Sequence, residues 1–219
     1  MIEAGISLLV GITAVLTIYG RYQQKQNWVY LFKPTTTLLI IALALWGLRD
    51  GLTEPVAYGY LIVAGLVLGL AGDVFLMLPA RYFLPGLGSF LAGHWFYIAA
   101  FTAGIGLVLS WWLLPLLLVG GVVYGLLHHH LGQMRLPVIV YVIVILLMAG
   151  QALGRWSLLE TTPALMAAIG SVLFVVSDAA LALNRFRRPF NAADLLVLST
   201  YWLAQWFIAM SLVLPGLTL

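Results

Sequence analysis

Two aspartates inside long apolar stretches are the residues of this chain best placed to do chemistry. Asp73 stands in the run LVLGLAGDVFLMLP, and Asp178 stands in the run GSVLFVVSDAALALNR. Even on a lenient insertion scale, an ionised carboxylate in hydrocarbon costs about 2.5–3.5 kcal/mol. The chain has only 7 acidic residues, and two of them lie in such runs. We therefore interpret them as a functional pair, the alternative being a structural pair capped by neighbouring hydrogen-bond donors.

The composition places the whole chain in a membrane. Of the 219 residues, 63% are hydrophobic and 8% are charged, whereas soluble domains carry about 25% charged residues. The mean hydropathy is +1.09. No segment is polar enough to form a separate soluble domain, so we expect one transmembrane domain over residues 1–219. The 10 basic residues lie between apolar runs, where they orient the chain. They do not indicate a nucleic-acid partner.

The apolar runs have the length of membrane-spanning helices, which need about 20 residues. Polar, proline-containing or glycine-containing breaks separate them, among them the turn over 49–55. The pattern predicts an all-α, polytopic bundle of eight transmembrane helices, or seven if the second run is too short to span. The predicted helices are 3–20, 34–50, 55–78, 86–107, 110–127, 135–153, 161–183 and 192–214.

The basic residues are distributed unequally between the two sides of this bundle. Arg49 and Arg155 lie in one set of loops, and the other eight basic residues lie in the alternate set: Arg21, Lys25, Lys33, Arg81, Arg135, Arg185, Arg187 and Arg188. The positive-inside rule places the second set in the cytoplasm. We expect a multi-pass protein of the bacterial inner (plasma) membrane with both termini outside.

The two aspartate-bearing runs also suggest an internal repeat. Each is followed by a basic turn and then by a helix containing tyrosine, with Tyr97 24 residues after Asp73 and Tyr201 23 residues after Asp178. Four helices separate the two segments, so both run in the same direction across the membrane. This indicates a four-plus-four parallel repeat. At about 1.5 Å per residue, both aspartates would lie roughly 9–11 Å inside the same end of the bundle.

Other polar side chains in or beside the apolar runs are candidates for lining a pocket around the carboxylates. His94 and Tyr97 are spaced i and i+3, and Tyr201 and Gln205 are spaced i and i+4, so each pair shares a helix face. Each such residue alone is more often a satisfied buried polar group. The candidates for substrate binding are Lys33, His94, Tyr97, Tyr141, Asn184, Tyr201 and Gln205, with Arg81 and Arg185 for a head-group phosphate.

The sequence does not predict a metal centre or a cofactor. The chain contains no cysteine, which excludes disulfides, thiolate catalysis and cysteine-ligated metals. The consecutive histidines His128, His129 and His130 would point about 100° apart on a helix, so one ion would not reach all three easily. We interpret them as a solvated turn.

Six short stretches, spread over nearly the whole chain, carry these polar residues in a characteristic order. They are KP at 33–34, GDVFLML at 72–78, FLAGHWFY at 90–97, PVIVY at 137–141, SDAALALNRF at 177–186 and YWLAQ at 201–205. This ordered set resembles the YhhN-like family, whose animal members are lysoplasmalogenases. The resemblance implies an eight-helix membrane protein with a lysophospholipid substrate, surrounded by membrane lipids. It implies hydrolysis of the vinyl ether of lysoplasmalogen to a fatty aldehyde and glycerophosphoethanolamine or glycerophosphocholine.

The chemistry of that reaction agrees with a pair of aspartates. A vinyl ether hydrolyses by slow proton transfer to its β-carbon, after which water adds to the α-carbon and the hemiacetal collapses. The reaction needs one neutral carboxylic acid and one carboxylate, and it needs neither a nucleophilic serine nor a metal. Asp73 and Asp178 are therefore the predicted catalytic residues.

Two other classes of function use paired aspartates within membranes. A transporter or an ion- or proton-coupled carrier would use them as a relay or a cation site, and helices broken in mid-membrane would favour it. An intramembrane aspartyl protease is the third interpretation. It fits less well, because LAGD at 70–73 lacks the first glycine of the GxGD motif that the protease family carries and Asp178 follows a serine.

Overall fold

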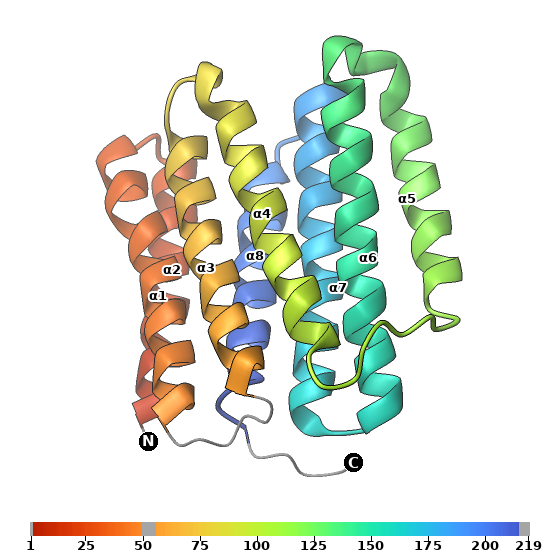
Figure 1. The fold of residues 1–219 in the computed structure, drawn as a ribbon. Coiled ribbons are helices and arrows are strands. Elements are labelled where there is room, and N and C mark those ends of the chain that lie inside the picture. Colours follow the sequence, from red (N-terminus) through yellow and green to blue (C-terminus); the bar gives the residue numbers. More distant parts are fainter. Residues whose placement is uncertain (1, 50–55, 215–219) are drawn as a thin grey trace.

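The computed structural model describes residues 2–49 and 56–214, and this part of the chain folds as a bundle of eight α-helices without strands (Figure 1). It confirms the all-α polytopic bundle. The helices are α1 (Ile2–Tyr22), α2 (Gln26–Arg49), α3 (Val56–Met77), α4 (Phe83–Thr102), α5 (Leu113–Leu127), α6 (Arg135–Leu159), α7 (Thr162–Ala182) and α8 (Ala193–Met210). The π-helix η4 (Leu183–Arg187) extends α7.

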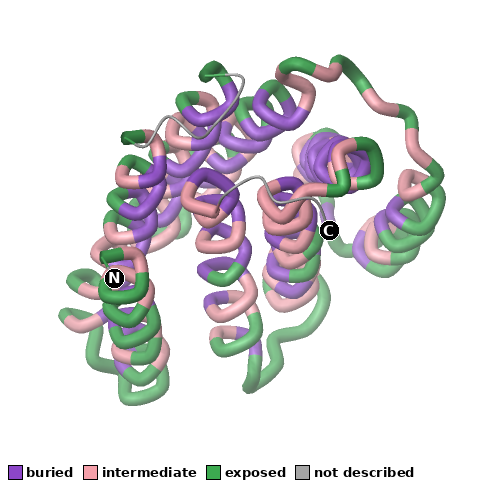
Figure 2. Tube along the Cα trace, turned by 90° about the horizontal axis from the view of Figure 1, so that it is seen from below, coloured by how far each residue is buried: buried purple, intermediate pink, exposed green. Residues whose placement is uncertain are grey.

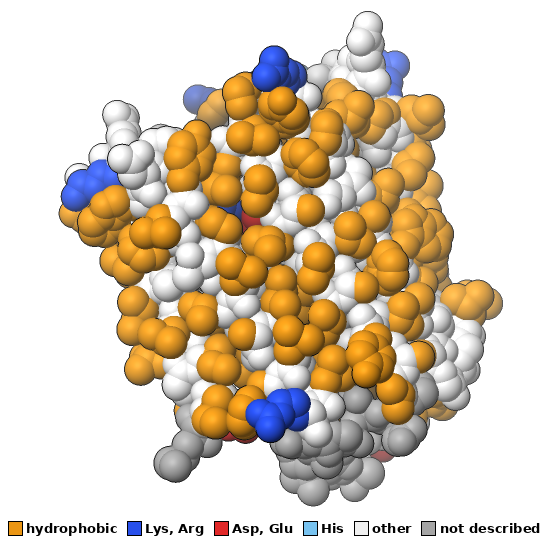
Figure 3. All heavy atoms as spheres, turned by 60° about the vertical axis from the view of Figure 1, so that its left-hand side comes forward, with side chains coloured by type: hydrophobic (Ala, Val, Ile, Leu, Met, Phe, Trp, Pro, Cys, Tyr) orange, Lys and Arg blue, Asp and Glu red, His pale blue; other side chains and the backbone are white. Residues whose placement is uncertain are grey.

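The helices have the surface that a bilayer requires. Seven segments of the described chain are long and apolar enough to cross a membrane. The eighth helix, α4, contains proline, glycine, serine and histidine, which lower its hydropathy, but it packs along α3 like its neighbours. Hydrophobic side chains dominate the face drawn in Figure 3, with lysine and arginine near its upper and lower edges. Exposed residues follow the outward faces of the helices, and buried residues follow the inward faces (Figure 2).

The second helix begins earlier than the sequence predicts. α2 starts at Gln26 rather than at 34, so Pro34 lies inside the helix. Proline there removes one backbone donor. The hydroxyls of the next two residues, Thr35 and Thr36, donate hydrogen bonds to the carbonyls of Leu31 and Phe32. The helix continues through the proline and keeps Lys33 within it. Of the predicted turn over 49–55, Arg49 is the last residue of α2, and residues 50–55 lie outside the described residues.

Six helices form a closed ring. In order around the bundle they are α2, α3, α4, α6, α7 and α8, and α8 packs on α2 to close it. α1 packs outside on α2 and α8, and α5 packs outside on α6 and η4. In a four-plus-four repeat, each helix corresponds to the helix four positions later, and the count passes from α8 back to α1. The packed pairs α2/α3, α3/α4 and α4/α6 then correspond to the packed pairs α6/α7, α7/α8 and α8/α2. The ring therefore has the arrangement that a four-plus-four parallel repeat produces.

Glycines at matching positions of the two halves allow close helix packing. Gly65 lies eight residues before Asp73, and Gly170 lies eight before Asp178. A Cβ atom on Gly65 would collide with the ring of Tyr97 in α4, and one on Gly170 would lie 2.6 Å from the carbonyl oxygen of Ala204 in α8. Small residues at such contacts let helix backbones approach one another.

The two aspartates lie near the same end of the bundle. Asp73 is four residues before the end of α3, and Asp178 is four residues before the end of α7. Each is therefore about one helical turn from that end. We call it the basic end, and it comprises the connections 23–25, 78–82 and 128–134 together with residues 183–192. It is the upper end of the bundle in Figure 1, opposite the end at which α1 begins and α8 finishes.

Candidate active site

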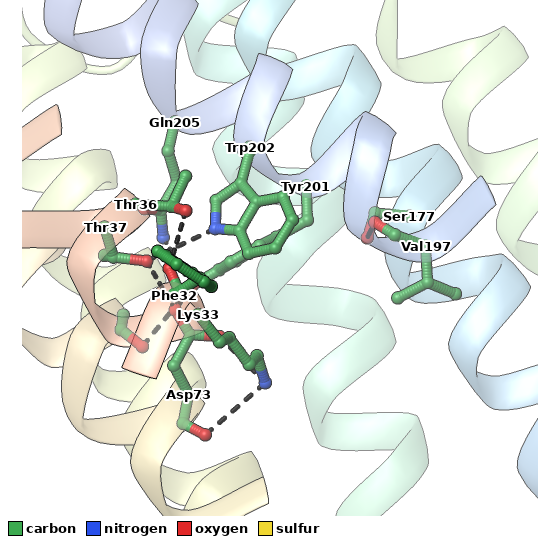
Figure 4. A network of polar contacts seen from close by, with 11 residues as sticks. Phe32, Lys33, Thr36, Thr37, Asp73, Ser177, Val197, Tyr201, Trp202 and Gln205 are labelled. Atoms are coloured by element: carbon green, nitrogen blue, oxygen red, sulfur yellow. Dashed lines mark hydrogen bonds and ion pairs between the residues drawn. The ribbon is translucent and has the colours of Figure 1, made fainter. Parts of the chain in front are cut away.

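Asp73 is held by three side chains from two neighbouring helices (Figure 4). The residue is 1% exposed. Its Oδ1 pairs with Nζ of Lys33 at 3.2 Å, and its Oδ2 accepts hydrogen bonds from the hydroxyls of Thr37 at 2.7 Å and Tyr201 at 2.9 Å. Lys33 and Thr37 are one turn apart on α2, while Tyr201 comes from α8. A cation and two hydroxyl donors together stabilise an ionised carboxylate.

A second set of side chains fixes these donors. Gln205 donates from Nε2 to the hydroxyl of Tyr201 at 2.7 Å, and Trp202 donates from its indole nitrogen to the hydroxyl of Thr37 at 3.4 Å. Both come from α8, so one helix positions both hydroxyls. Each hydroxyl that accepts such a bond keeps its own proton for Asp73, and this sets the direction of the network.

Asp178 has a different environment. It is partly buried, and its Oδ2 accepts a hydrogen bond of 2.5 Å from the hydroxyl of Tyr141 in α6. Within the described residues, no lysine, arginine or histidine forms an ion pair with it. Its other oxygen, Oδ1, is left for a proton or a ligand. The two carboxylates therefore differ in charge environment although they occupy matching positions of the repeat.

One cavity contacts both aspartates. We call it the polar cavity, and its volume is about 160 Å³, which is room for several water molecules. Lys33, Asp73, Ser177, Asp178 and Tyr201 line it, and toward the basic end it is also lined by Arg21, Gln26, Asn184 and Asp194. The prediction that Asp73 and Asp178 face a common space thus agrees with the structure.

A second hollow meets the first beside Asp178. We call it the apolar groove. Among the described residues that line it, only Asp178 and Tyr141 have polar atoms in their side chains. The remaining lining side chains are hydrophobic, apart from Gly120, and come from α3 to α7 and η4. Four residues line both spaces, namely Leu76, Phe90, Asp178 and Leu181.

Two of the predicted pocket residues lie elsewhere. His94 and Tyr97 are each 1% exposed and line neither the polar cavity nor the apolar groove. They pack in an aromatic cluster, where the His94 ring lies 5.1 Å from the ring of Phe174 and 5.3 Å from that of Tyr141. Their polar side-chain atoms have no hydrogen-bond partner among the described residues. The i, i+3 spacing correctly predicted that the two side chains share a helix face. It did not predict which part of the bundle that face contacts.

The arginines expected to bind phosphate also lie outside both spaces. The guanidinium of Arg81 stacks on Tyr82, and that of Arg185 lies 3.7 Å from the centroid of the Phe83 ring. Asn184 does line the polar cavity, and its Oδ1 accepts the backbone N–H of Phe190. Of the remaining candidates, Lys33 and Tyr201 line the polar cavity, Tyr141 lines the groove, and Gln205 lies behind Tyr201.

Sequence reasoning missed three site residues. Thr37 contacts Asp73, and its i, i+4 spacing from Lys33 was the available signal, because this spacing puts both on one helix face. Arg21 and Asp194 line the polar cavity and form an ion pair at 3.0 Å, with side chains 43% and 42% exposed. Residues 173 positions apart give no local signal that they meet.

Comparison with known proteins agrees with the resemblance found in the sequence. The sequence profile of the YhhN family matches residues 28–212. The "Uncharacterized membrane protein YhhN" of Escherichia coli O157:H7 is 30% identical over 212 residues, covering 94% of this chain and 98% of the relative.

Two mammalian relatives carry the name of an enzyme. "Lysoplasmalogenase TMEM86A" of Bos taurus is 35% identical over 173 residues, covering 76% of this chain and 70% of the relative. "Lysoplasmalogenase TMEM86B" of Homo sapiens is 29% identical over 190 residues, covering 86% and 77%. No solved structure matches the chain significantly. The profile match covers most of the bundle, including both aspartates, and this multi-pass membrane protein belongs to the YhhN family.

Proposed function

We propose that this protein is an intramembrane hydrolase that cleaves the vinyl ether bond of a lysoplasmalogen, releasing a fatty aldehyde and glycerophosphoethanolamine or glycerophosphocholine. The observation that carries the proposal is the pair of unequal carboxylates on one cavity, one held by a cation and one by a single hydroxyl. The names of the mammalian relatives support the substrate class. Acid and base roles are commonly divided between two carboxyl groups in this way.

The surroundings of each carboxylate suggest its role. Asp178, with no cation paired to it within the described chain, is the neutral acid, and it delivers its proton to the β-carbon of the vinyl ether. Asp73, held ionised by Lys33, stabilises the resulting oxocarbenium ion and accepts a proton from the water that adds to the α-carbon. Collapse of the hemiacetal moves its hydroxyl proton to the departing glycerol oxygen. Return of the proton from Asp73 to Asp178 completes the cycle.

The helices that carry the aspartates favour an enzyme over a transporter. α3 and α7 are continuous through Asp73 and Asp178, whereas transporter sites are typically built from helices broken near the middle of the membrane. The polar cavity also lies toward the basic end, because residues from the ends of α1, α3, α7 and α8 line it. One-sided access suits a substrate that enters and leaves from the same leaflet.

Purified protein in detergent should release aldehyde from lysoplasmenylethanolamine. The matched control is the saturated alkyl-ether analogue, which has the same head and chain length but no double bond to protonate, and it should release none. Aldehyde is measured by coupled oxidation or by mass spectrometry. If the wild-type protein releases no aldehyde from the vinyl ether, the proposed reaction is wrong for this chain.

The basic end faces the cytoplasm in this proposal, as the positive-inside rule predicts for a bacterial inner membrane. The chain lacks cysteine, so single substitutions report position cleanly. Arg187→Cys at the basic end should resist a membrane-impermeant thiol reagent added to intact cells, while Leu109→Cys in the connection 103–112 at the opposite end should react. Both side chains are exposed. Strong labelling of position 187 from outside, with position 109 protected, would reverse the orientation.

A further inference from the structure

The apolar groove lies between α4 and α5, which do not pack closely against each other. α4 packs on α3 and α6, and α5 packs on α6 and η4. The groove runs between α4 and α5, because Phe83 and Leu87 line it from α4 while Val119 and Val123 line it from α5. Its floor is formed by α6 and α7. A hollow between two helices that is lined almost wholly by apolar side chains suits a hydrocarbon chain.

The groove opens sideways into the region that lipid tails occupy. Val119 lines it and is nevertheless 46% exposed, and exposed leucines and valines surround this position on α5, namely Leu114, Leu117, Leu118 and Val122. At Gly120, α5 packs closely against α6, because a Cβ atom there would collide with Leu146. α5 thus forms a wall with a lipid-facing outer side and a groove-facing inner side.

The groove adjoins the polar cavity at Asp178. The residues common to both spaces, Leu76, Phe90, Asp178 and Leu181, form the junction. On one side of the junction the lining is apolar, and on the other it carries Lys33, Arg21 and two further aspartates, Asp73 and Asp194. A molecule that occupies both spaces must therefore be a hydrocarbon at one end and charged or polar at the other. The bond between its two parts would lie next to Asp178.

We propose that the apolar groove binds the hydrocarbon chain of a single-chain lipid, which enters laterally from the bilayer between α4 and α5 while its polar head enters the polar cavity. The identity of the bond that reacts rests on the proposed function, but the binding pose does not. The groove offers one apolar site, and the polar cavity that receives the rest of the molecule is lined by charged side chains such as Lys33 and Asp73, so a second chain on the glycerol would lie against charges. The groove therefore selects lysolipids over diacyl lipids.

Photo-crosslinking tests the groove without catalysis. The probe is a saturated alkyl-ether lysophosphatidylethanolamine with a diazirine near the end of its chain, which the proposed reaction does not cleave. After irradiation of the full-length protein in detergent, peptide mass spectrometry should place the label on groove-lining residues of α5 and α6. Excess unlabelled lysophosphatidylethanolamine should compete, and diacyl phosphatidylethanolamine should not. Equal competition by the diacyl lipid, or label confined to the lipid-facing side of α5, would refute the proposal.

Two adjacent valines on α5 provide a matched pair of variants. Val123→Trp fills the groove, and overpacking of this kind should reduce groove labelling about tenfold. Val122→Trp adds the same bulk to the lipid-facing side, where Val122 is 56% exposed, and it should label like the wild type. The Val123→Trp effect should be smaller for a short-chain probe, which a general loss of folding would not produce. Equal labelling of the two variants would overturn the assignment.

The outcome is separable from that of the aldehyde assay. Groove labelling without aldehyde release would support the binding pose and refute the proposed reaction. Aldehyde release with no groove labelling would support the reaction and refute the pose.

Discussion

Asp178→Asn and Asp73→Asn should each reduce aldehyde release from lysoplasmenylethanolamine by at least about a hundredfold, because general acid–base catalysis contributes about 10²–10⁴. Asparagine keeps the size of the side chain and part of its hydrogen bonding, but it neither donates nor accepts the proton that the reaction moves. The measurement is the initial rate of aldehyde formation by each purified variant. Wild-type rates in both variants would contradict the proposed roles of the carboxylates.

Folding and activity are separable in this experiment. The amide of asparagine is neutral and similar in size to the protonated carboxyl group assigned to Asp178, so Asp178→Asn should elute from size exclusion and unfold like the wild type. Glu160→Gln is the matched control. It makes the same chemical change at the exposed residue that follows α6, away from the basic end, and it should retain full activity. A comparable loss of activity in this control would show that the effect is not specific to the cavity.

Lys33→Met should destabilise the protein by about 3–5 kcal/mol, because it removes one partner of a buried ion pair and leaves the other charge uncompensated. The Lys33 side chain is 10% exposed, that of Asp73 is 2% exposed, and Lys33 donates a further bond to the carbonyl of Asp73. Thermal unfolding in detergent measures the effect. Arg21→Met is the contrast, since the exposed pair of Arg21 with Asp194 should contribute less than about 1 kcal/mol.

The double variant Lys33→Met/Asp73→Asn decides the cause of that loss. Removing the second charge should restore most of the stability, because the cost arises from an unpaired carboxylate and not from missing packing. The double variant should still be inactive. If it is no more stable than Lys33→Met alone, the loss comes from packing around the lysine stem, and the ion-pair explanation fails.

The sequence predicted the parts of the site that are costly to place in a membrane. Asp73 and Asp178 stood out because a carboxylate in an apolar run is energetically costly and is therefore usually functional. The eight helices followed from the lengths of the apolar runs. Thr37 did not stand out, since a threonine within a helix can satisfy its hydroxyl on a carbonyl one turn back. His94 and Tyr97 had the right spacing, but their helix turns them into the aromatic cluster around Phe174.

The start of α2 shows a different limit of local reasoning. Pro34 resembled a helix start, because proline is favoured in the first turn. The helix instead begins at Gln26, and this extension places Lys33 beside Asp73. The continued helix makes tertiary contacts that a local pattern does not show, and one of them, the ion pair of Lys33 with Asp73, joins residues 40 positions apart.

The arrangement of the two outer helices gives the bundle a broken symmetry. In the repeat, α1 corresponds to α5 and α8 corresponds to α4. α1 packs on α8, and a hydrogen bond of 2.9 Å from the indole of Trp206 to Ser7 joins them. Its counterpart α5 packs on α6 and η4 instead, and the apolar groove lies between it and α4. α1 therefore closes one of two related helix contacts, whereas the other, between α5 and α4, stays open beside Asp178.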